Sequence, residues 1–487
     1  MTQRITINPV TRIEGHGRIE IFLDDQGEVR DAFWQVVELR GFERFCVGRP
    51  AEEMTRIAPN ICGVCPSAHH MAATKALDAL YSVEPTPTAR LLRELEFNAF
   101  FIEDHFIHFF FLAAPDFILG PDADPSERNI LGVIGKVGKE IGLKVIDIRK
   151  RNRDIIRLLF GKAPHPEGGL PGGVPRGIAE EDRKGLIATA DDSVALALFA
   201  LDLFKKEVLG QKALKDLILS EAYALKAYSM ALVDGNDCVT FYDGTVKVVA
   251  PDGKEFVRFH PRDYLAHIAE WVEPWTTVKF CFLRQLGWKG LVEGEETSLY
   301  RVAPLARLNV AGGMATPLAQ KEYEFFFDTL GGRPAPHTLA MHWARLICAL
   351  QAAERNRDIV RDPLLTSRDL RNMDLKLVRT GVGCVEAPRG TLFHHYETDE
   401  RGILTRVNLI VATQNNAGPI CLSVKKAAKA FVRGPEVKEG FLNRVEMAFR
   451  AYDPCLACAT HSLPGRIPFV VNLRDPSGEI IRTLGRE

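Results

Sequence analysis

The longest apolar segments of the chain repeat with the period of a helix. Residues 86–114, "TPTARLLRELEFNAFFIEDHFIHFFFLAA", open with threonine and proline, which suit a helix start, and then carry apolar residues on nearly every face. Two further segments, 191–232 and 337–360, show a similar helical pattern. These three segments predict a bundle of long helices that is buried in the core.

Strand patterns flank this helical part of the sequence. Residues 17–39 alternate apolar and polar positions around "DDQG", and residues 241–259 contain two turn signals. Near the end of the chain, "PFVVNL" and "EIIRTL" flank "DPSG" within residues 468–484, which is typical of another β hairpin. The Gly/Pro-rich segment 160–178 is typical of a long loop. We therefore predict an α+β fold that is mainly α, with peripheral β hairpins around the helical bundle.

Length and the burial of the helices give different expectations for the number of domains. The chain has 487 residues, which suggests roughly three domains. The helical segments on both sides of 160–178 nevertheless look equally buried, and this favours one compact unit. We expect residues 1–461 to form this single domain.

Charge and hydropathy exclude several classes of partner. The formal net charge is -1, so no general attraction to nucleic acid or to an anionic membrane is expected. The apolar segment 105–120 contains Pro115 and Asp116 and is shorter than a membrane span, so a buried core helix is the better interpretation. The first residues contain no apolar segment typical of a secretory signal. We expect a cytoplasmic protein with reduced cysteines and no membrane span.

Two cysteine pairs stand at opposite ends of the chain. Cys62 and Cys65 occur in "NICGVCPSAHH", and Cys455 and Cys458 occur in "DPCLACATH". One CxxC pair alone is often a redox pair or half of a structural zinc site. The pairs of a zinc ribbon usually lie within a few tens of residues, whereas Cys65 and Cys455 are 390 positions apart. We predict a metal site that forms between two distant parts of an already folded core.

The chemistry of four thiolates narrows the choice of metal. Four negative charges in one place require a strongly cationic centre, and soft sulfur ligands suit nickel, iron, copper(I) or zinc. The remaining cysteines are scattered, and we interpret them as small buried apolar residues: Cys46, Cys238, Cys281, Cys348, Cys384 and Cys421. They contain no four-cysteine run for an iron–sulfur cluster, so electrons from a redox centre would have to leave to another subunit.

Four motifs together resemble the large, catalytic subunit of nickel–iron hydrogenases. They are "PVTRIEGHGRIEI", "ICGVCPSAHH", "EAPRGTLFHHY" and "AYDPCLACATH", in the family's order and spread over the whole chain. "VELRGFERF", "RGTLFHHY" and "SVKKAAKAF" resemble the cytoplasmic heteromultimeric branch, of the heterodisulfide-reductase-linked, viologen-reducing type or the NAD-reducing type. The resemblance implies the nickel–iron hydrogenase large-subunit fold and reversible heterolytic cleavage of dihydrogen. It also implies that the chain has an iron–sulfur small subunit, together with further electron-transfer subunits, for its partners.

The resemblance assigns the metal ligands residue by residue. Cys62 and Cys455 match terminal ligands of nickel, and Cys65 and Cys458 match ligands that bridge nickel to an iron carrying carbon monoxide and cyanide. A terminal thiolate is a reasonable first acceptor of the proton. Glu14 matches the family's carboxylate beside the terminal cysteine and would relay the proton onward. From the residues alone, Glu14 could instead pair with Arg12 or Arg18 on the same hairpin.

Further residues match the surroundings of the metals in the family. The resemblance implies that Arg389 hydrogen-bonds one cyanide, that Thr413 donates to the other, and that Asp104 and Asp453 orient the arginine. For Asp453, a helix N-cap or a turn residue before proline is the alternative interpretation. His69, four residues after Cys65, would hydrogen-bond a bridging sulfur.

The chain continues for 26 residues after the last motif. In the family, a maturation endopeptidase cuts after the histidine matched here by His461, so the resemblance implies removal of the extension 462–487. His461 and Glu43 match ligands of a further octahedral ion, magnesium or iron. One position departs from the family: Asn60 stands where relatives commonly carry arginine, which puts in doubt a local salt bridge or a partner contact.

Four other functions remain open from the sequence. A regulatory hydrogen-sensing large subunit would carry the same ligands, but sensors tend to lack the extension. The catalytic subunit of an NAD-reducing hydrogenase fits the same motifs. A quinone-dehydrogenase or Complex I subunit shares the ancestry but has lost the nickel cysteines, all four of which are present here. A structural zinc protein is disfavoured by the distance between the pairs.

Overall fold

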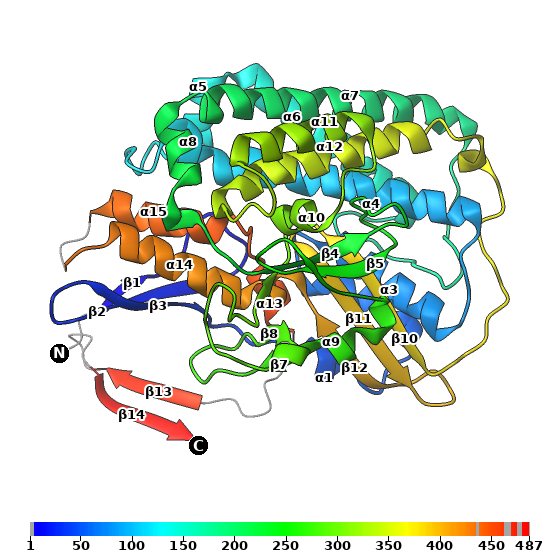
Figure 1. Cartoon of the computed structure of the whole chain (residues 1–487). Helices are drawn as coiled ribbons and strands as arrows, with labels where there is room; N and C mark the ends of the chain where they lie inside the picture. Colours follow the sequence, from blue (N-terminus) through cyan, green and yellow to red (C-terminus); the bar gives the residue numbers. More distant parts are fainter. Residues whose placement is uncertain (1–3, 435–437, 462–468, 475–479, 487) are drawn as a thin grey trace.

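Long helices form the upper part of the molecule in Figure 1. The structure is a computed structural model that describes residues 4–434, 438–461, 469–474 and 480–486. The long helices are α4 (Pro87–Ile107), α6 (Lys139–Phe160), α7 (Glu180–Phe204) and α12 (Met341–Ile359). Helix α12 packs against α4 and α7, and α4 packs against α6. The side chain of Thr86 caps α4 by accepting the N–H of Ala89. The predicted buried helical bundle is confirmed.

The other α-helices are shorter, and several of them pack against the sheets. They are α1 (Phe42–Cys46), α2 (Met54–Ile57), α3 (Pro66–Leu80), α5 (Ile130–Val137), α8 (Lys212–Leu219), α9 (Tyr264–His267), α10 (Pro304–Val310), α11 (Pro317–Leu330), α13 (Ala412–Asn415), α14 (Ala417–Phe431), α15 (Glu439–Arg450) and α16 (Leu456–Ala459). Within the part of the chain that the structure describes, none of the helices combines the length and apolar character that a bilayer crossing requires.

The apolar segment 105–120 continues α4 as buried helix. It contains two π-helical stretches, η3 (His108–Ala113) and η4 (Pro115–Leu119). Asp116 in η4 is buried and pairs with Arg12 and, at 2.6 Å, with Arg450 of α15. These ion pairs connect the helix to the N-terminal segment and to the segment that precedes the second cysteine pair.

The prediction of helix over residues 191–232 is wrong at its end. Helix α7 continues as the π-helical stretch η5 (Lys205–Leu209) and is followed by α8, but Tyr228–Val233 forms strand β4. Every residue of β4 is buried. A strand buried on both faces carries apolar residues without alternation, so its pattern resembles that of a buried helix.

The predicted hairpins are present. Strands β1 (Arg4–Ile7), β2 (Gly17–Leu23) and β3 (Val29–Val36) form one antiparallel sheet. A second sheet has the order β6-β5-β4-β9, with β5 (Thr245–Val249), β6 (Glu255–Phe259) and β9 (Tyr300–Arg301), and β7 (Ile268–Trp271) pairs with β8 (Phe280–Leu283). Strands β13 (Phe469–Arg474) and β14 (Ile480–Arg486) pair only with each other among the described strands, and Figure 1 shows this hairpin outside the main body. The α+β class is confirmed.

A further sheet, which no sequence pattern indicated, is buried over most of its length. It consists of β10 (Thr380–Ala387), β11 (Gly390–Thr398) and β12 (Leu404–Ile410), and α3 packs directly on β10 and β11. A Cβ atom at Gly383 of β10 would lie 2.1 Å from the carbonyl oxygen of Ala72 in α3. Glycine is therefore required for this close approach.

One continuous apolar core contains both cysteine pairs. It includes residues from Ile7 near the beginning of the chain to Ala459 in α16. Segments that are almost the whole sequence apart are thus packed into one interior. This packing positions the residues described next.

Candidate metal centre

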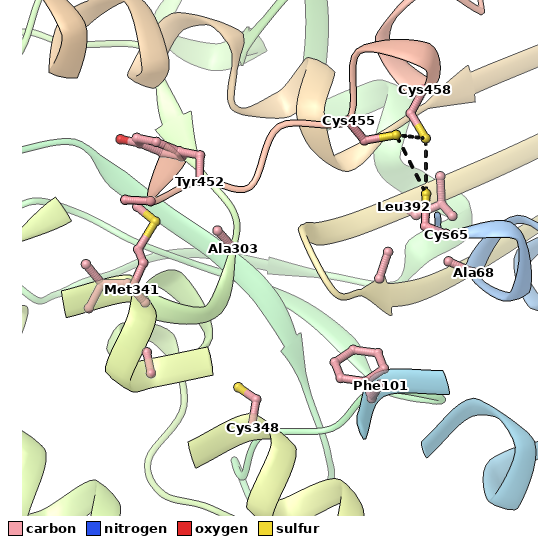
Figure 2. Close-up of a cluster of buried hydrophobic side chains, with 14 of the residues drawn as sticks. Cys65, Ala68, Phe101, Ala303, Met341, Cys348, Leu392, Tyr452, Cys455 and Cys458 are labelled. Atoms are coloured by element: carbon pink, nitrogen blue, oxygen red, sulfur yellow. Dashed lines mark hydrogen bonds between the residues drawn. The ribbon is translucent and has the colours of Figure 1, made fainter. Parts of the chain in front are cut away.

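Cys62, Cys65, Cys455 and Cys458 form a single buried cluster. Their Sγ atoms all lie within 4.8 Å of one another. The sulfur of Cys455 is 3.0 Å from that of Cys62 and 2.9 Å from that of Cys458, and Cys65 is 3.2 Å from Cys458. All four are free cysteines, and Figure 2 shows the sulfurs of Cys65, Cys455 and Cys458 pointing toward one another. The structure thus brings together the four ligands that the sequence suggested.

Each cysteine pair lies at the start of a helix. Cys65 is the N-cap of α3, whose first residue is Pro66, and Cys455 is the N-cap of α16. The backbone N–H groups of Val64 and Cys65 donate to the sulfur of Cys62 at 3.2 and 3.3 Å. Backbone donors aimed at sulfur favour the thiolate form that a metal ligand requires.

Arg40 connects the two cysteine pairs. Its Nη2 donates to the carbonyl of Ile61, which precedes Cys62, at 2.5 Å, and to the carbonyl of Ala457. Its Nε donates to the hydroxyl of Thr460 at 3.0 Å. One guanidinium therefore holds both ligand-bearing segments in place.

The donor set fits a cationic metal centre. Burial raises the pKa of the Cys455 and Cys458 thiols well above the ordinary value, because the low-dielectric interior and the neighbouring sulfurs disfavour the charged form. A tetrahedral metal with sulfur ligands at about 2.3 Å places them about 3.8 Å apart, so the cluster is already close to coordination size. A metal cation would supply the missing positive charge.

A small cavity lies beside the cysteines. Its apolar wall comes from several elements of the core and consists of Ala68, Ala387, Leu392, Val411 and Ala412. Figure 2 places Leu392 and Ala68 next to Cys65. Arg389 and Thr413 add two side chains that can donate hydrogen bonds. Such a lining suits small diatomic ligands, some held by apolar contact and others by a hydrogen bond.

Glu14 contacts the second cysteine pair directly. Its Oε2 lies 3.1 Å from Cys455 Sγ and accepts the N–H of Ala457 at 2.9 Å, and its backbone carbonyl accepts the N–H of Leu456. Burial raises the pKa of its carboxyl, which favours a group able to gain and lose a proton. The alternative pairing of Glu14 with an arginine is not present, because Arg12 pairs with Asp116 and Arg18 with Glu20 and Gln35.

Arg389 is held by two buried carboxylates. Its Nη1 donates to Asp104 at 3.0 Å, and its Nη2 lies 2.8 Å from the carboxylate of Asp453. Although burial alone would lower the pKa of Arg389, the two carboxylates raise it, and the guanidinium stays charged. Burial raises the pKa of Asp104 to about 7. The predicted group of Arg389 and two aspartates is therefore present beside the cysteines.

Asp453 has an unusual backbone conformation. Its φ is +54°, in the left-handed region, although it is not glycine and precedes Pro454. Such a residue costs of order 1–3 kcal/mol and persists only when its surroundings determine it. Arg389 provides this restraint, because its Nε donates to the Asp453 carbonyl at 2.7 Å while Nη2 holds the carboxylate. Asp453 is not a helix N-cap, since Cys455 takes that position in α16.

The β10–β11 turn fixes the position of Arg389. Glu386, just before the turn, pairs with the buried Arg307 at 2.7 Å and accepts the hydroxyl of Thr391 at 2.6 Å. Gly390 has a φ of +128°, and a Cβ there would lie 2.1 Å from Val302. The sequence "EAPRG" is thus a rigid support for the arginine.

His69 also contacts the cysteine cluster. Its Nε2 lies 3.3 Å from Cys458 Sγ, and its Nδ1 lies 3.1 Å from Nε2 of His394. The Nδ1 atom of His394 in turn lies 2.6 Å from the hydroxyl of Tyr396. The expected contact of His69 with a matched bridging sulfur is present.

Thr413 lies between the cavity and the second cysteine pair. Its hydroxyl oxygen accepts the N–H of Cys455 at 3.0 Å. Because this bond uses an oxygen lone pair, the hydroxyl hydrogen is left to donate. The geometry is compatible with the predicted donation into the cavity.

Glu43 lies next to His461, which is the last described residue before the segment 462–468. Glu43 Oε1 is 3.7 Å from His461 Nε2 and accepts the N–H of Leu409 at 2.7 Å. Both ring nitrogens of His461 face carbonyl oxygens, of Cys458 at 2.6 Å and of Leu409 at 2.7 Å. A neutral imidazole has one N–H, so it satisfies only one of them. A hard cation between His461, Glu43 and the Leu409 carbonyl would resolve the other contact.

The structure also places Asn60 and the six scattered cysteines. Asn60 donates to the carbonyl of Arg56 at 2.8 Å and lines a surface groove with Phe42 and Phe45. Five of the six scattered cysteines are buried as expected, but Cys238 is partly exposed, which corrects its interpretation as a buried residue. It lies in a turn, where its N–H donates to Asp234.

Sequence reasoning missed four residues in the surroundings of the site. Arg40 acts through backbone carbonyls, and Leu409 offers its own carbonyl, so no side-chain pattern marks them. His394 and Tyr396 belong to one of the four motifs, but no role was predicted for them. Their spacing of two on a strand that also carries Leu392 could have placed them on one face.

Comparison with known proteins places this site in a known family. Residues 40–128 and 296–461 match the model described as nickel-dependent hydrogenase, and residues 4–39 match one described as HoxL-like. The chain is 47% identical over 483 residues to an iron-sulfur subunit of the F420-non-reducing hydrogenase of Archaeoglobus profundus, with 99% of each chain covered. It is 39% identical over 503 residues to the beta subunit of the NAD-reducing hydrogenase HoxS of Cupriavidus necator, again with 99% coverage of each.

Solved structures support the same likeness. A crystal structure of an NAD+-reducing nickel–iron hydrogenase in the H2-reduced state superposes with a TM-score of 0.88 at 36% identity, and the match covers 94% of this chain and 100% of the other. The likeness therefore extends over nearly the whole chain and not over one motif.

We predict that each of the four clustered cysteines is needed for metal binding. Replacing Cys62 or Cys455 by alanine removes one of four sulfur donors and should lower bound transition metal at least about tenfold. The matched control is Cys421→Ala, which removes an isolated buried thiol. Metal per chain, measured by mass spectrometry on purified protein of unchanged thermal stability, checks this. Equal metal loss in all three variants would contradict the assignment.

Proposed function

The chain belongs to the nickel-dependent hydrogenases, and from this premise we propose how its own residues carry the reversible heterolytic cleavage of dihydrogen. The observation that supports the assignment is the convergence of four free, buried sulfurs within 4.8 Å of one another, with the carboxylate of Glu14 on Cys455. Cys62 and Cys455 would hold the nickel, and Cys65 and Cys458 would contribute to holding both the nickel and the iron. When bound, the nickel–iron pair supplies the Lewis-acid and redox chemistry for splitting dihydrogen.

Glu14 moves the proton away from the centre. It is within hydrogen-bond distance of the Cys455 sulfur, and its raised pKa reduces the cost of protonating it. Its second contact, with the N–H of Ala457, keeps the carboxylate aimed at the sulfur. Glu14 is only partly buried, so the proton can continue toward the surface.

Arg389 and Thr413 would hold the small ligands of the iron. We assign the cavity beside Cys65 to carbon monoxide and cyanide, because apolar walls suit the former and the donors Arg389 and Thr413 suit the latter. Asp104 and Asp453 keep the guanidinium charged and fixed in orientation. This arrangement also places a positive charge beside the thiolates, which stabilises them.

A second, hard cation belongs at Glu43 and His461. A carboxylate oxygen, the Leu409 carbonyl and an imidazole nitrogen form a donor set that suits magnesium, or a further iron, with water molecules completing the coordination. Because Glu43 also donates its N–H to the His461 carbonyl, the ion would fix the end of the catalytic core.

We propose that the chain works as the large subunit of a heteromultimeric complex that also contains an iron–sulfur small subunit, together with further electron-transfer subunits. Its identity of 47% to the F420-non-reducing relative exceeds the 39% to the NAD-reducing one, which favours the former type. The NAD-reducing type is the alternative, supported by the TM-score of 0.88. All ten cysteines are free, which is typical of a reducing compartment such as the cytoplasm.

We propose that the working subunit consists of residues 1–461 and that an endopeptidase removes 462–487. His461 is buried and its carbonyl is bound by Glu43, whereas strands β13 and β14 form a sheet of their own. The junction itself, 462–468, lies outside the described residues. The four sulfurs lie together in the full-length chain, so the tail is compatible with a closed cluster.

We predict that Glu14→Gln blocks proton transfer while the metals stay bound. Glutamine keeps the size of the side chain but cannot accept the proton, so dihydrogen oxidation and the exchange of D2 with solvent protons should fall by about 100-fold or more. Glu20→Gln on the same hairpin is the matched control, since this buried carboxylate pairs with Arg4 and Arg18. Wild-type exchange in Glu14→Gln at full nickel content would refute the relay.

We predict that the nickel-loaded protein ends at His461. Intact-mass spectrometry of the complex from nickel-supplied cells should show a chain of residues 1–461, or 2–461 without the initiator methionine. Protein from nickel-starved cells should retain the extension, because cleavage follows metal insertion. Active, nickel-loaded protein that still contains residue 487 would contradict the processing proposal.

A further inference from the structure

A buried line of polar groups leads from the cysteine cluster into the β10–β11–β12 sheet. Cys458 Sγ, His69, His394 and the hydroxyl of Tyr396 follow one another at 3.3, 3.1 and 2.6 Å. All four side chains are buried. Among the described residues, His394 is the one hydrogen-bond partner of the Tyr396 hydroxyl. The line therefore has a sulfur at one end and a phenol at the other.

The distances require one proton in each of the three gaps. Two ring nitrogens 3.1 Å apart, such as those of His69 and His394, share a single proton, because two hydrogens would collide and two lone pairs would repel. A neutral imidazole has one donor and one acceptor nitrogen, so the tautomer of one ring determines the tautomer of the next. Both rings are buried, and among the described residues neither contacts a carboxylate that would hold it as an imidazolium, so each ring is the neutral form.

A metal-bound thiolate at Cys458 determines which group donates and which accepts in each hydrogen bond of this line. Cys458 can only accept, so His69 Nε2 carries the hydrogen and its Nδ1 must accept from His394 Nε2. His394 Nδ1 then has no hydrogen and must accept from the hydroxyl of Tyr396. In this direction all three contacts are proper hydrogen bonds. Tyr396 is the group that starts the line, because its hydroxyl can donate.

The fold holds the line rigidly. His394 and Tyr396 are two residues apart on β11 and lie on the same face of the strand, paired with Gly383 and Gly381 of β10. These glycines allow α3, which carries His69, to pack directly on the sheet. None of the three side chains can rotate to another conformation without breaking a buried hydrogen bond.

We infer that His394 and Tyr396 are positioning residues that fix the tautomer of His69, so that its Nε2–H always donates to the Cys458 sulfur. The inference rests on the proposed ligand role of Cys458. A hydrogen bond to a metal-bound sulfur withdraws electron density from it and raises the reduction potential of the metal centre. Tyr396, which is separated from the sulfur by two imidazole rings, thus tunes the centre without touching it.

The variant that tests this role is Tyr396→Phe, in the complete metal-loaded complex. Without the hydroxyl, His394 loses the partner that fixes its tautomer, and the donation from His69 to Cys458 weakens. The midpoint potential of the nickel centre, followed by electron paramagnetic resonance during a redox titration, should shift to a more negative value.

Tyr264→Phe is a closely matched control. Tyr264 is equally buried, and its hydroxyl lies 3.0 Å from Nδ1 of His395, the neighbour of His394, and accepts from Asn408 at 2.6 Å. This change removes the same atom from the same kind of tyrosine–histidine pair but outside the line to Cys458. We expect its midpoint potential to equal that of the wild type, with a loss of thermal stability similar to that of Tyr396→Phe.

A double variant shows whether Tyr396 acts through His69. In a His69→Leu background, Tyr396→Phe should produce no further shift, since the donor to the sulfur is already absent. An unchanged potential in Tyr396→Phe, or an equal shift in Tyr264→Phe, would overturn the inference. If instead the wild-type complex gave no nickel signal, the proposed function would fail and not only this inference.

Discussion

The gathering of four buried thiols is the constraint on which the rest of the structure depends. Removing several thiolates from water without enough positive charge is strongly unfavourable, and among the residues that the structure describes the guanidiniums close by include those of Arg389 and Arg40. A cationic centre between the sulfurs would allow all four to ionise and would balance their charge. Because Cys62 and Cys455 come from opposite ends of the chain, the site also requires the whole core to fold before it exists.

Different residues around the cluster make different contacts with it. Arg40 joins the two ligand-bearing segments through backbone carbonyls, and Glu14 is held by the same backbone that carries Cys455. Arg389 is fixed by carboxylates and by a rigid turn, and it maintains Asp453 in a left-handed conformation. The proposed proton relay, the proposed ligand cavity and the proposed tuning line thus reach the sulfurs through different residues.

Much of this could be predicted from the sequence, and the failures have physical reasons. The long helices and the hairpins appear because their apolar period is regular, and the cysteine pairs are recognisable because side chains carry the chemistry. Strand β4 was mistaken for helix because burial on both faces removes the alternation. Arg40 and the Leu409 carbonyl were missed because contacts through the backbone leave no residue pattern. The tautomer line to Tyr396 depends on distances across a sheet, which spacing alone does not give.

Infrared spectroscopy of the purified complex, combined with metal analysis of the same sample, tests the central claim most directly. The account predicts nickel and iron bound together with carbon monoxide and cyanide stretching bands, because the four sulfurs and the cavity beside Cys65 would hold such a pair. Zinc as the bound metal, with no such bands, would contradict it.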